Sequence, residues 1–277
     1  MKIFKTTTGT IIDFDGKKYH LGDTDWDAFI NRDDLHQTVK RQLINAEQVT
    51  DSWFDQQQLE PPIDTQEIWA AGVTYLRSRD ARMEESKDSG GDTFYDKVYD
   101  AERPEIFYKG SRQRTVGTGG KIRIRKDSAW NVPEPELTLF MSTSGAIVGY
   151  TIGNDVSSRS IEGENPLYLP QAKVYDGCAA LGPCLYVPAN PIDENSQITL
   201  EIKRDGKIAF NDAIAISRMK RKHVELAAYL FMECSFPTGV YMMTGTGIVP
   251  GDGFTLSSGD EVSITIDNIG TLRNIVA

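Results

Sequence analysis

Two glutamates, one residue apart, stand directly before an apolar run in this chain. Glu134 and Glu136 belong to the segment Pro-Glu-Pro-Glu-Leu, and residues two apart on a β-strand face the same side. Two neighbouring carboxylates repel each other, and burying them is costly unless a cation joins them. Mg²⁺ prefers a few carboxylates together with waters and substrate oxygens. The spacing therefore indicates a divalent-cation site, and a solvated edge strand is the simpler alternative.

Three further features have the chemical types that such a site would use. Asp155 follows the apolar run 147–152, where the chain is expected to leave a strand. Lys173 is the single cation of the segment Gln-Ala-Lys; near a metal it would steady an enolate or move a proton, and otherwise it is a surface ion-pair residue. Gly245 and Thr246 belong to the segment Thr-Gly-Thr-Gly. Their N–H and hydroxyl groups would bind a carboxylate, unless the segment is a plain tight turn.

Other catalytic arrangements find little support in the composition. The chain has three histidines, none beside the carboxylates in sequence, which argues against a His-rich zinc or non-haem iron site. It contains no Gly-x-Ser-x-Gly segment, so a serine hydrolase is not indicated. Its three cysteines are too few for a disulfide framework. They are expected to be reduced and structural, in a cytoplasmic protein.

The charge balance limits the partners. Thirty basic residues stand against 40 acidic ones, a net charge of −10, whereas a nucleic-acid binder usually has a basic surplus. No apolar run approaches the roughly 18 residues that a membrane span needs. The one basic stretch, from Lys109 to Lys126, is interpreted as a solvated or subunit-contact face. The alternative is that one or two of its cations meet an anionic substrate.

The patterning predicts a β-rich α+β protein with two domains. Residues 1–65 form a small N-terminal α+β domain, with a hairpin around Asp15-Gly16 and a helix that begins at Asp34. The double proline at 61–62 is interpreted as a linker. Residues 66–277 form the catalytic domain, a barrel or layered sheet. Its strands are expected at 122–124, 137–141, 147–152, 197–203, 207–214, 241–243 and 261–266, and its one clear apolar helix at 224–234.

Several ordered segments together resemble the fumarylacetoacetate hydrolase superfamily. They are Glu-Pro-Glu-Leu at 134–137, Gly-Tyr-Thr-Ile-Gly-Asn-Asp-Val-Ser-Ser-Arg at 149–159, Gln-Ala-Lys-Val-Tyr-Asp at 171–176, Leu-Gly-Pro at 181–183, Thr-Gly-Thr at 244–246 and Gly-Asp-Glu-Val at 259–262. The resemblance implies a mixed β-roll fold and a Mg²⁺ ion held by Glu134, Glu136 and Asp155. It also implies a 2-oxo or 2,4-dioxo acid substrate that chelates the metal, with Lys173 and Thr246 near it. A homo-oligomer, either a dimer or a tetramer, is implied as well.

One departure from that pattern bears on the reaction. Hydrolases and decarboxylases of the superfamily carry a histidine shortly after a Gly-x-x-Tyr element. Here the element is Gly-Val-Thr-Tyr at 72–75, and no histidine follows it. The segments 101–105 and 158–171 are instead similar to those of the 2-keto-3-deoxy-D-arabinonate dehydratases. That branch converts its substrate to 2-oxoglutarate semialdehyde in pentose degradation.

A dehydratase reaction agrees with these residues. A 2-oxo acid would bind Mg²⁺, or Mn²⁺, through its carboxylate and keto oxygens. The cation would then stabilise the enolate formed when a C3 proton leaves. Expulsion of the C4 hydroxyl group needs a proton donor. We assign proton transfer to Lys173 and Glu105; an ordinary ion pair with Arg103 or Lys109 is the alternative for Glu105.

Substrate binding is expected of Thr246, Gly245, Arg77 and Arg79. The two arginines stand beside the polar stretch 84–93, which would form a lid over the substrate. The alternative is that Arg77 and Arg79 are solvated surface residues without a role in substrate binding.

Two other functions stay open at this point. One is a C–C bond hydrolase or decarboxylase of 2-oxo or 2,4-dioxo acids, similar to an acylpyruvase, which would need another base. The other is an oxo-acid binding protein that has lost catalysis. A binding protein, however, has no need of an acidic triad with a lysine.

Overall fold

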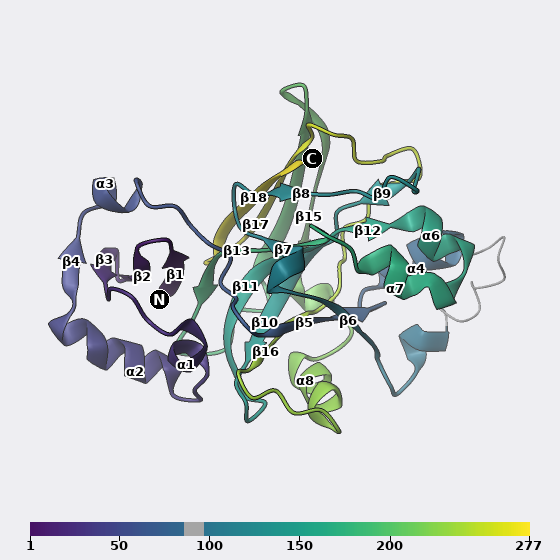
Figure 1. The fold of residues 1–277 in the computed structure, drawn as a ribbon. Helices are drawn as coiled ribbons and strands as arrows, with labels where there is room; N and C mark the ends of the chain where they lie inside the picture. The colour runs from purple at the N-terminus through teal and green to yellow at the C-terminus, as the bar shows by residue number, and fades with distance from the viewer. Residues whose placement is uncertain (86–96) are drawn as a thin grey trace.

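The computed structural model describes residues 1–85 and 97–277 as three β-sheets surrounded by short helices (Figure 1). One sheet dominates. Its main path, in spatial order, is β4 (Glu47–Val49), β3 (Lys17–His20), β2 (Gly9–Phe14), β1 (Lys2–Thr6), β13 (Ala179–Tyr186), β11 (Ile147–Asp155), β10 (Pro135–Met141), β16 (Val240–Met243), β5 (Glu67–Gly72) and β6 (Glu105–Ser111). The short strand β7 (Thr115–Val116) pairs with β13 in parallel.

A second sheet packs across the first. Its strands, in spatial order, are β15 (Lys207–Ala215), β14 (Gln197–Arg204), β17 (Glu261–Ile266), β18 (Gly270–Val276) and β8 (Lys121–Ile122). Buried residues alternate with more exposed ones along β14 and β17, the pattern of a sheet with one covered face. All residues of β10 are buried, because it lies in the middle of the molecule. A third, two-stranded sheet pairs β9 (Asn131–Val132) with β12 (Ser157–Ser158).

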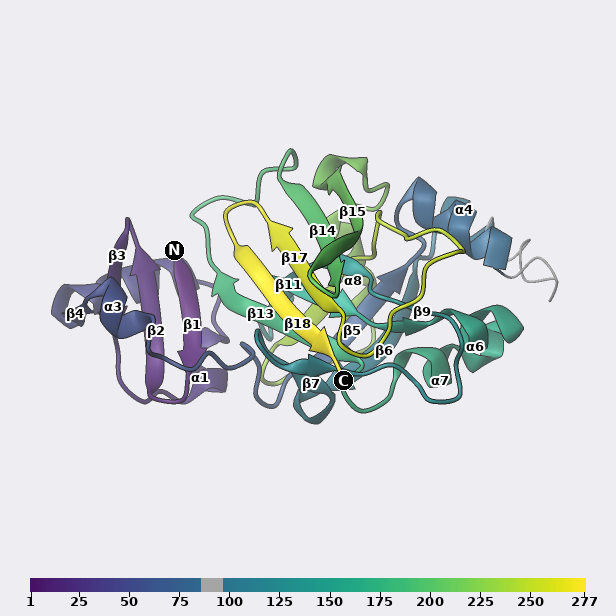
Figure 2. The same cartoon turned by 90° about the horizontal axis from the view of Figure 1, so that it is seen from above.

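The described helices lie around the sheets. They are α1 (Trp26–Ile30), α2 (Leu35–Gln42), α3 (Asp51–Phe54), α4 (Leu76–Glu85), α6 (Arg159–Glu164), α7 (Leu169–Lys173) and α8 (His223–Phe231), with single 3₁₀ turns at 43–45, 112–114, 166–168 and 216–218. Figures 1 and 2 place α1–α3 beside the N-terminal strands, and α4, α6 and α7 at the opposite end of the molecule. None of the helices in the described residues is both long and apolar enough to cross a membrane.

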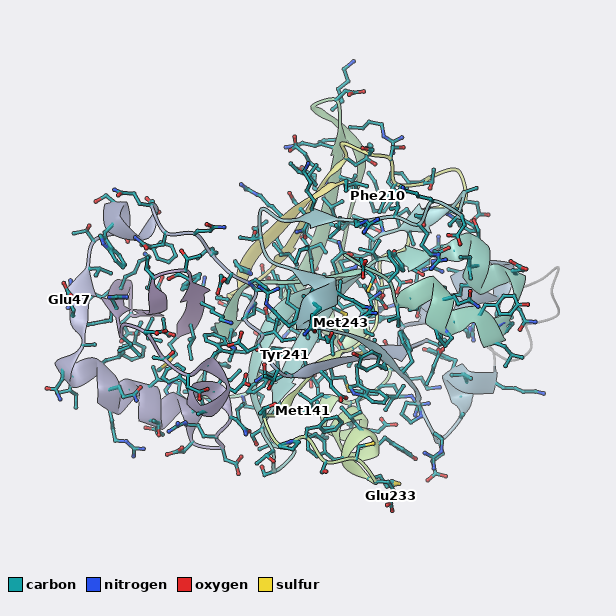
Figure 3. All side chains as sticks on the ribbon, viewed as in Figure 1. Glu47, Met141, Phe210, Glu233, Tyr241 and Met243 are labelled. Carbon is teal, nitrogen blue, oxygen red and sulfur yellow. The ribbon has the colours of Figure 1, made fainter. Side chains whose placement is uncertain are left out.

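Two hydrophobic clusters hold these layers together. One lies between the two larger sheets and includes Leu137, Ile152, Leu200 and Ile264. The other joins residues of the N-terminal helices to the large sheet, where Tyr241 and Met243 belong to it. Figure 3 shows both of these side chains in the middle of the molecule and Glu47 and Glu233 at its edges.

The N-terminal part begins with the expected hairpin. Asp15 and Gly16 have φ values of 52° and 73°, as the tight turns of two-residue hairpins require. β1 pairs with β13, so these strands extend the large sheet. The proline pair at 61–62 is buried, and Pro62 accepts a hydrogen bond from the Tyr241 hydroxyl. A domain boundary between residues 65 and 66 stays a prediction.

The predicted strands are present, with some changes in their bounds. The strand expected at 122–124 ends at Ile122, and the helix expected at 224–234 ends at Phe231. Cys234 therefore lies beyond α8 and is exposed, so the prediction that it is structural is wrong. The chain after α8 turns outward, and Met232 is likewise 58% exposed. An apolar sequence pattern does not ensure burial at a helix end.

Candidate metal centre and active site

The start of β10 and the end of β11 bring three carboxylates together. In this antiparallel pair Glu136 lies opposite Gly153, and the Asp155 N–H donates to the Glu134 carbonyl over 3.0 Å. Because side chains alternate along a strand, Glu134, Glu136 and Asp155 project from the same face. One oxygen from each carboxylate lies within 4.8 Å of the others. The three residues are between 1% and 3% exposed.

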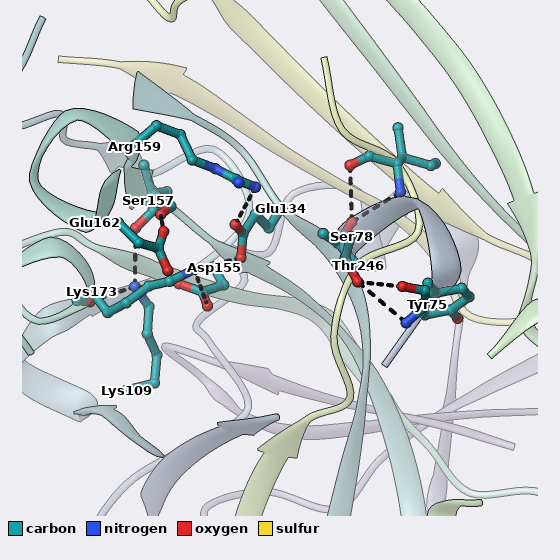
Figure 4. A network of polar contacts seen from close by, with 12 residues as sticks. Tyr75, Ser78, Lys109, Glu134, Asp155, Ser157, Arg159, Glu162, Lys173 and Thr246 are labelled. Carbon is teal, nitrogen blue, oxygen red and sulfur yellow. Dashed lines mark hydrogen bonds and ion pairs between the residues drawn. The ribbon is translucent and has the colours of Figure 1, made fainter. Parts of the chain in front are cut away.

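Three buried cations form ion pairs with two members of this acidic triad, Glu134 and Asp155 (Figure 4). Lys173 Nζ lies 2.6 Å from Glu134 Oε2 and 3.1 Å from Asp155 Oδ2. Arg159 Nη2 lies 2.7 Å from Glu134 Oε1, and Lys109 Nζ lies 2.6 Å from Asp155 Oδ1. Buried charges are tolerated when they are paired in this way. The pairing confirms that these carboxylates are not an ordinary solvated edge.

Within residues 1–85 and 97–277, the buried cations form ion pairs with Glu134 and Asp155 but none with Glu136. Its Oε2 accepts a hydrogen bond from the Gly245 N–H over 2.5 Å. Burial raises the pKa of Glu136 well above its usual range, and the charges of Asp155 and Glu134 raise this pKa further. A divalent cation among the three carboxylates would relieve both effects. The set of hard oxygen donors thus fits Mg²⁺ or Mn²⁺.

Lys173 reaches the triad from the last residue of α7. Its side chain is 0% exposed, and its ammonium nitrogen lies 5.6 Å from the centre of the Phe107 ring. Two carboxylates and an aromatic face therefore surround the amine, so that its position is tightly defined. A lysine held in this way can exchange a proton with a neighbouring molecule in the cavity beside it.

That cavity is small, about 10 Å³, which is roughly the space of one water molecule. Besides the triad it is lined by Gly72, Ser78, Phe107, Arg159, Lys173, Gly245 and Thr246, among others. A larger cavity of about 780 Å³ lies beside α8. Its lining includes none of the triad, so we place the reaction at the smaller cavity, where the charged groups converge.

Glu105 is not part of the cavity lining, but it neighbours Gly72, which is. It pairs with Gly72 across β5 and β6, and a Cβ atom at Gly72 would collide with Glu105 Oε2. Because Gly72 itself lines the cavity, the Glu105 carboxylate lies next to its wall. The glycine is needed to make room for that carboxylate. A role of Glu105 in proton transfer stays a prediction.

Thr246 and Gly245 also line the cavity, as the sequence predicts. The Thr246 hydroxyl donates to the Ile248 carbonyl over 3.0 Å. Gly245 has a φ of +94°, and a Cβ there would collide with Thr74 Oγ1. The N–H of Gly245 faces Glu136 in the structure. A role of either residue in substrate binding stays a prediction.

The two arginines of α4 lie away from this lining. Arg77 is exposed, and Arg79 donates to Asp80 while stacking 5.2 Å from the Tyr99 ring. Ser78, which stands between them, lines the cavity instead. Most of the stretch expected to form a lid, 84–93, lies outside the described residues. Substrate binding by Arg77 and Arg79 therefore stays a prediction.

Sequence reasoning missed two of the buried cations. Arg159 was part of a matched segment without an assigned role. The basic stretch from Lys109 to Lys126 predicts a solvated or subunit-contact face, and for Lys109 this prediction is wrong, because its side chain is buried inside the chain at 0% exposure. The sequence gives one indication that Lys109 is buried. Lys109 lies within the run Ile-Phe-Tyr-Lys-Gly-Ser, which has the composition of a β-strand. The charges of Lys109 and Arg159 balance the acidic triad.

Comparisons with known proteins agree with this site. The sequence profile of the fumarylacetoacetate hydrolase C-terminal family matches residues 68–277. A probable 2-keto-3-deoxyxylonate dehydratase of Haloferax volcanii is 46% identical over 98% of this chain and 92% of its own length. The 2-dehydro-3-deoxy-D-arabinonate dehydratase of Saccharolobus solfataricus is 46% identical over 76% of this chain and 72% of its own length.

Solved structures give the same result for the fold. A 2-keto-3-deoxy-D-arabinonate dehydratase complexed with magnesium and 2,5-dioxopentanoate superposes with a TM-score of 0.84. The two chains are 37% identical, and the match covers 100% of this chain and 98% of that one. The profile match covers residues 68–277, and the Haloferax volcanii relative and the superposed structure cover nearly the whole chain. The chain belongs to the fumarylacetoacetate hydrolase family.

Proposed function

We propose that this protein is a Mg²⁺-dependent hydro-lyase that acts on a 2-keto-3-deoxy sugar acid. The proposed reaction converts 2-keto-3-deoxy-D-arabinonate to 2,5-dioxopentanoate, which is 2-oxoglutarate semialdehyde. The observation that best supports this proposal is the buried acidic triad, which is paired with Lys173. The chain is also similar over 98% of its length to a probable 2-keto-3-deoxyxylonate dehydratase. The absence of a histidine shortly after Tyr75 disfavours the hydrolase alternative, because that reaction needs a base to activate water.

The names of the two relatives lead to one substrate skeleton. D-Arabinonate and D-xylonate differ only at C2 and C3. In the 2-keto-3-deoxy acid both of these centres are gone, since C2 is a ketone and C3 a methylene group. The one remaining stereocentre is C4, which both D-acids share. A single five-carbon substrate therefore accounts for both names.

The chemistry requires more than one proton-transferring group. The first stage removes a proton from C3 and the hydroxyl group from C4, which leave together as water. The remaining C3–C4 double bond then moves: C5 and the C5 hydroxyl group each lose a proton and C3 and C4 each gain one, so that the C5 alcohol ends as an aldehyde. Protons are thus handled at C3, at the C4 oxygen and at C5. One residue would reach all of these positions only with difficulty.

The residues of the cavity divide these tasks. Glu134, Glu136 and Asp155 hold the cation, which when bound supplies positive charge to the substrate's carboxylate and keto oxygens. Lys173 moves the proton at C3. Glu105, on the Gly72 side of the cavity, donates to the departing C4 hydroxyl group. Thr246 and Gly245 bind the substrate in the cavity. Substrate binding by Arg77 and Arg79, which lie outside the cavity lining, is proposed from the sequence alone.

The proposal extends to the assembly and location of the protein. A homo-oligomer, a dimer or a tetramer, is proposed from the family resemblance. All three cysteines are free, which agrees with the reducing cytoplasm.

A panel of substrates tests the proposed function. The protein is incubated with Mg²⁺ and, in separate tubes, with 2-keto-3-deoxy-D-arabinonate, oxaloacetate and an acylpyruvate, and the products are identified by NMR. The proposal predicts 2,5-dioxopentanoate from the sugar acid and no C–C cleavage in the other two tubes. Cleavage of the acylpyruvate without dehydration of the sugar acid would favour the hydrolase alternative. Binding without any turnover would favour the binding protein.

A further inference from the structure

Lys109 occupies a β-bulge beside the acidic triad. On β5, Ile68 and Trp69 are adjacent residues. Their partners on β6, Gly110 and Tyr108, are two residues apart, so Lys109 is the extra residue. A bulge bends its strand and re-aims a side chain, and bulges are frequent next to active sites. Here the bulge accompanies a lysine that is 0% exposed.

The Lys109 ammonium group ties three separate elements together. Besides its ion pair with Asp155 at the end of β11, it donates to the backbone carbonyl of Val156 over 3.1 Å. It also donates to the carbonyl of Lys173 over 2.5 Å. An ammonium group has three N–H donors and no acceptor. Two of its N–H groups therefore donate to carbonyls, while Asp155 is held by the attraction of opposite charges.

These contacts determine where the Lys173 amine lies. Lys173 ends α7, and the last carbonyls of a helix lack partners within the helix. Lys109 supplies a partner for the carbonyl of Lys173 itself. It also holds Asp155 Oδ1 while Lys173 contacts Asp155 Oδ2. Asp155 thus lies between two lysines, and loss of Lys109 would free both the carboxylate and the end of α7.

Charge gives Lys109 a second effect on the site. Three buried cations, Lys109, Arg159 and Lys173, form ion pairs with Asp155 and Glu134 of the acidic triad and equal its three carboxylates in number. An uncharged residue at 109 would leave the triad with a net negative charge. Such a site would attract a divalent cation at least as strongly as before. Metal binding and turnover should therefore respond differently to the loss of Lys109.

From these contacts we propose that Lys109 is a positioning residue of the active site, which acts through Asp155 and Lys173 without touching the substrate. This inference rests on the proposed function, because it assigns proton transfer to Lys173. A misplacement of about 1 Å can lower turnover by about 100-fold. Loss of Lys109 should therefore lower kcat and leave KM and cation affinity nearly unchanged.

The test compares Lys109→Met and Lys109→Gln with the wild-type protein. Three quantities are measured: the melting temperature, the affinity for Mn²⁺ from the EPR signal of the free ion, and kcat and KM with 2-keto-3-deoxy-D-arabinonate. Lys5→Met is the matched control. Lys5 also forms an ion pair with an aspartate, Asp64, and donates to a backbone carbonyl, that of Ile63, but it lies in β1.

We expect Lys109→Met to lower kcat by about 10- to 100-fold with an equal or tighter Mn²⁺ affinity, and Lys5→Met to leave both unchanged. A kcat like that of the wild type would overturn the proposal. So would a fall in kcat that is matched by weaker Mn²⁺ binding, since Lys109 would then only shape the cation site. If Lys109→Met does not fold, Lys109→Gln, which keeps an N–H donor without the charge, is judged by the same criteria.

A second readout separates this proposal from the proposed function. Exchange of the C3 hydrogens of pyruvate for deuterium, followed by NMR, requires proton transfer at C3 but no leaving group. If the wild-type protein catalyses exchange without dehydrating the sugar acid, only the proposed function fails. The role of Lys109 is then decided by the effect of the variants on the exchange rate. If the wild-type protein does neither, both proposals fail.

Discussion

Lys173 Nζ lies 2.6 Å from Glu134 Oε2, and these side chains are 0% and 4% exposed, respectively. The amine that we assign to proton transfer is thus in contact with a carboxylate of the acidic triad. This contact orients the amine, and it links the cation site to the proton-transfer step. Substitutions at Lys173 should therefore separate catalysis from metal binding.

Lys173→Met should lower kcat by about 100- to 10,000-fold, the usual contribution of a general acid or base. Mn²⁺ should bind as well as in the wild type or more tightly, because the acidic triad loses one neutralising charge. Steady-state kinetics and Mn²⁺ EPR measure the two effects. Lys18→Met, which removes a surface ion pair with Asp51, is the control and should leave both unchanged. A Lys173→Met protein with near wild-type kcat would remove Lys173 from the mechanism.

Substitutions of Glu105 and of Gly72 should both lower kcat, because both affect the Glu105 carboxylate. Glu105→Gln removes the proton donor and should lower kcat with little change in Mg²⁺ affinity. Gly72→Ala places a methyl group against Glu105 Oε2, so it should displace the carboxylate and also lower kcat. Gly251→Ala is the matched control, because a Cβ there meets no other atom within 4 Å. Unchanged kcat in Glu105→Gln would contradict the assignment of Glu105, whatever Gly72→Ala does.

His223 should make the protein less stable in acid. Burial lowers the pKa of His223 below its ordinary value of 6.5, although the Glu194 charge opposes this effect. Because the pKa in the folded state is lower than that in the unfolded state, the stabilisation is present above pH 6.5. It is lost as the pH falls through the folded-state pKa. His223→Gln should therefore show a smaller fall in melting temperature between pH 7.5 and pH 5 than the wild type. An equal fall would show that His223 does not contribute.

The three cysteines should differ in reactivity. Cys234 is exposed, whereas Cys178 and Cys184 are buried, and burial raises the pKa of the Cys184 thiol to about 12. A thiol reagent at pH 8 should therefore modify Cys234 rapidly in the native protein and all three cysteines after denaturation. Cys234→Ser should abolish the rapid phase. Rapid modification of Cys184 in the native protein would contradict the packing of β13.

The parts of the site that follow from strand alternation could be predicted from the sequence. Glu134 and Glu136 share a face because they are two residues apart, and Asp155 joins them because β11 ends there. The hairpin at Asp15-Gly16 was predictable for a similar reason, since few residues adopt the backbone angles that its turn requires.

Contacts between distant segments could not be predicted in this way. Lys109 looks like a member of a basic surface stretch, and only the bulge in β6 and the position of α7 reveal that it is buried. The proximity of Glu105 to the cavity depends on its pairing with Gly72 across two strands. Such contacts depend on tertiary packing, which no local pattern of residue types records.

The most direct test of the account is the metal dependence of the dehydration. Purified protein is freed of metal with EDTA and assayed with 2-keto-3-deoxy-D-arabinonate before and after Mg²⁺ is restored, with 2,5-dioxopentanoate detected through a coupled dehydrogenase. Glu136→Gln, which changes one carboxylate of the acidic triad, is assayed in parallel. We predict no product after EDTA treatment, full recovery with Mg²⁺, and little recovery in the variant at the same Mg²⁺ concentration. Product formation that persists in EDTA and in the variant would contradict the assignment of the acidic triad as the catalytic metal site.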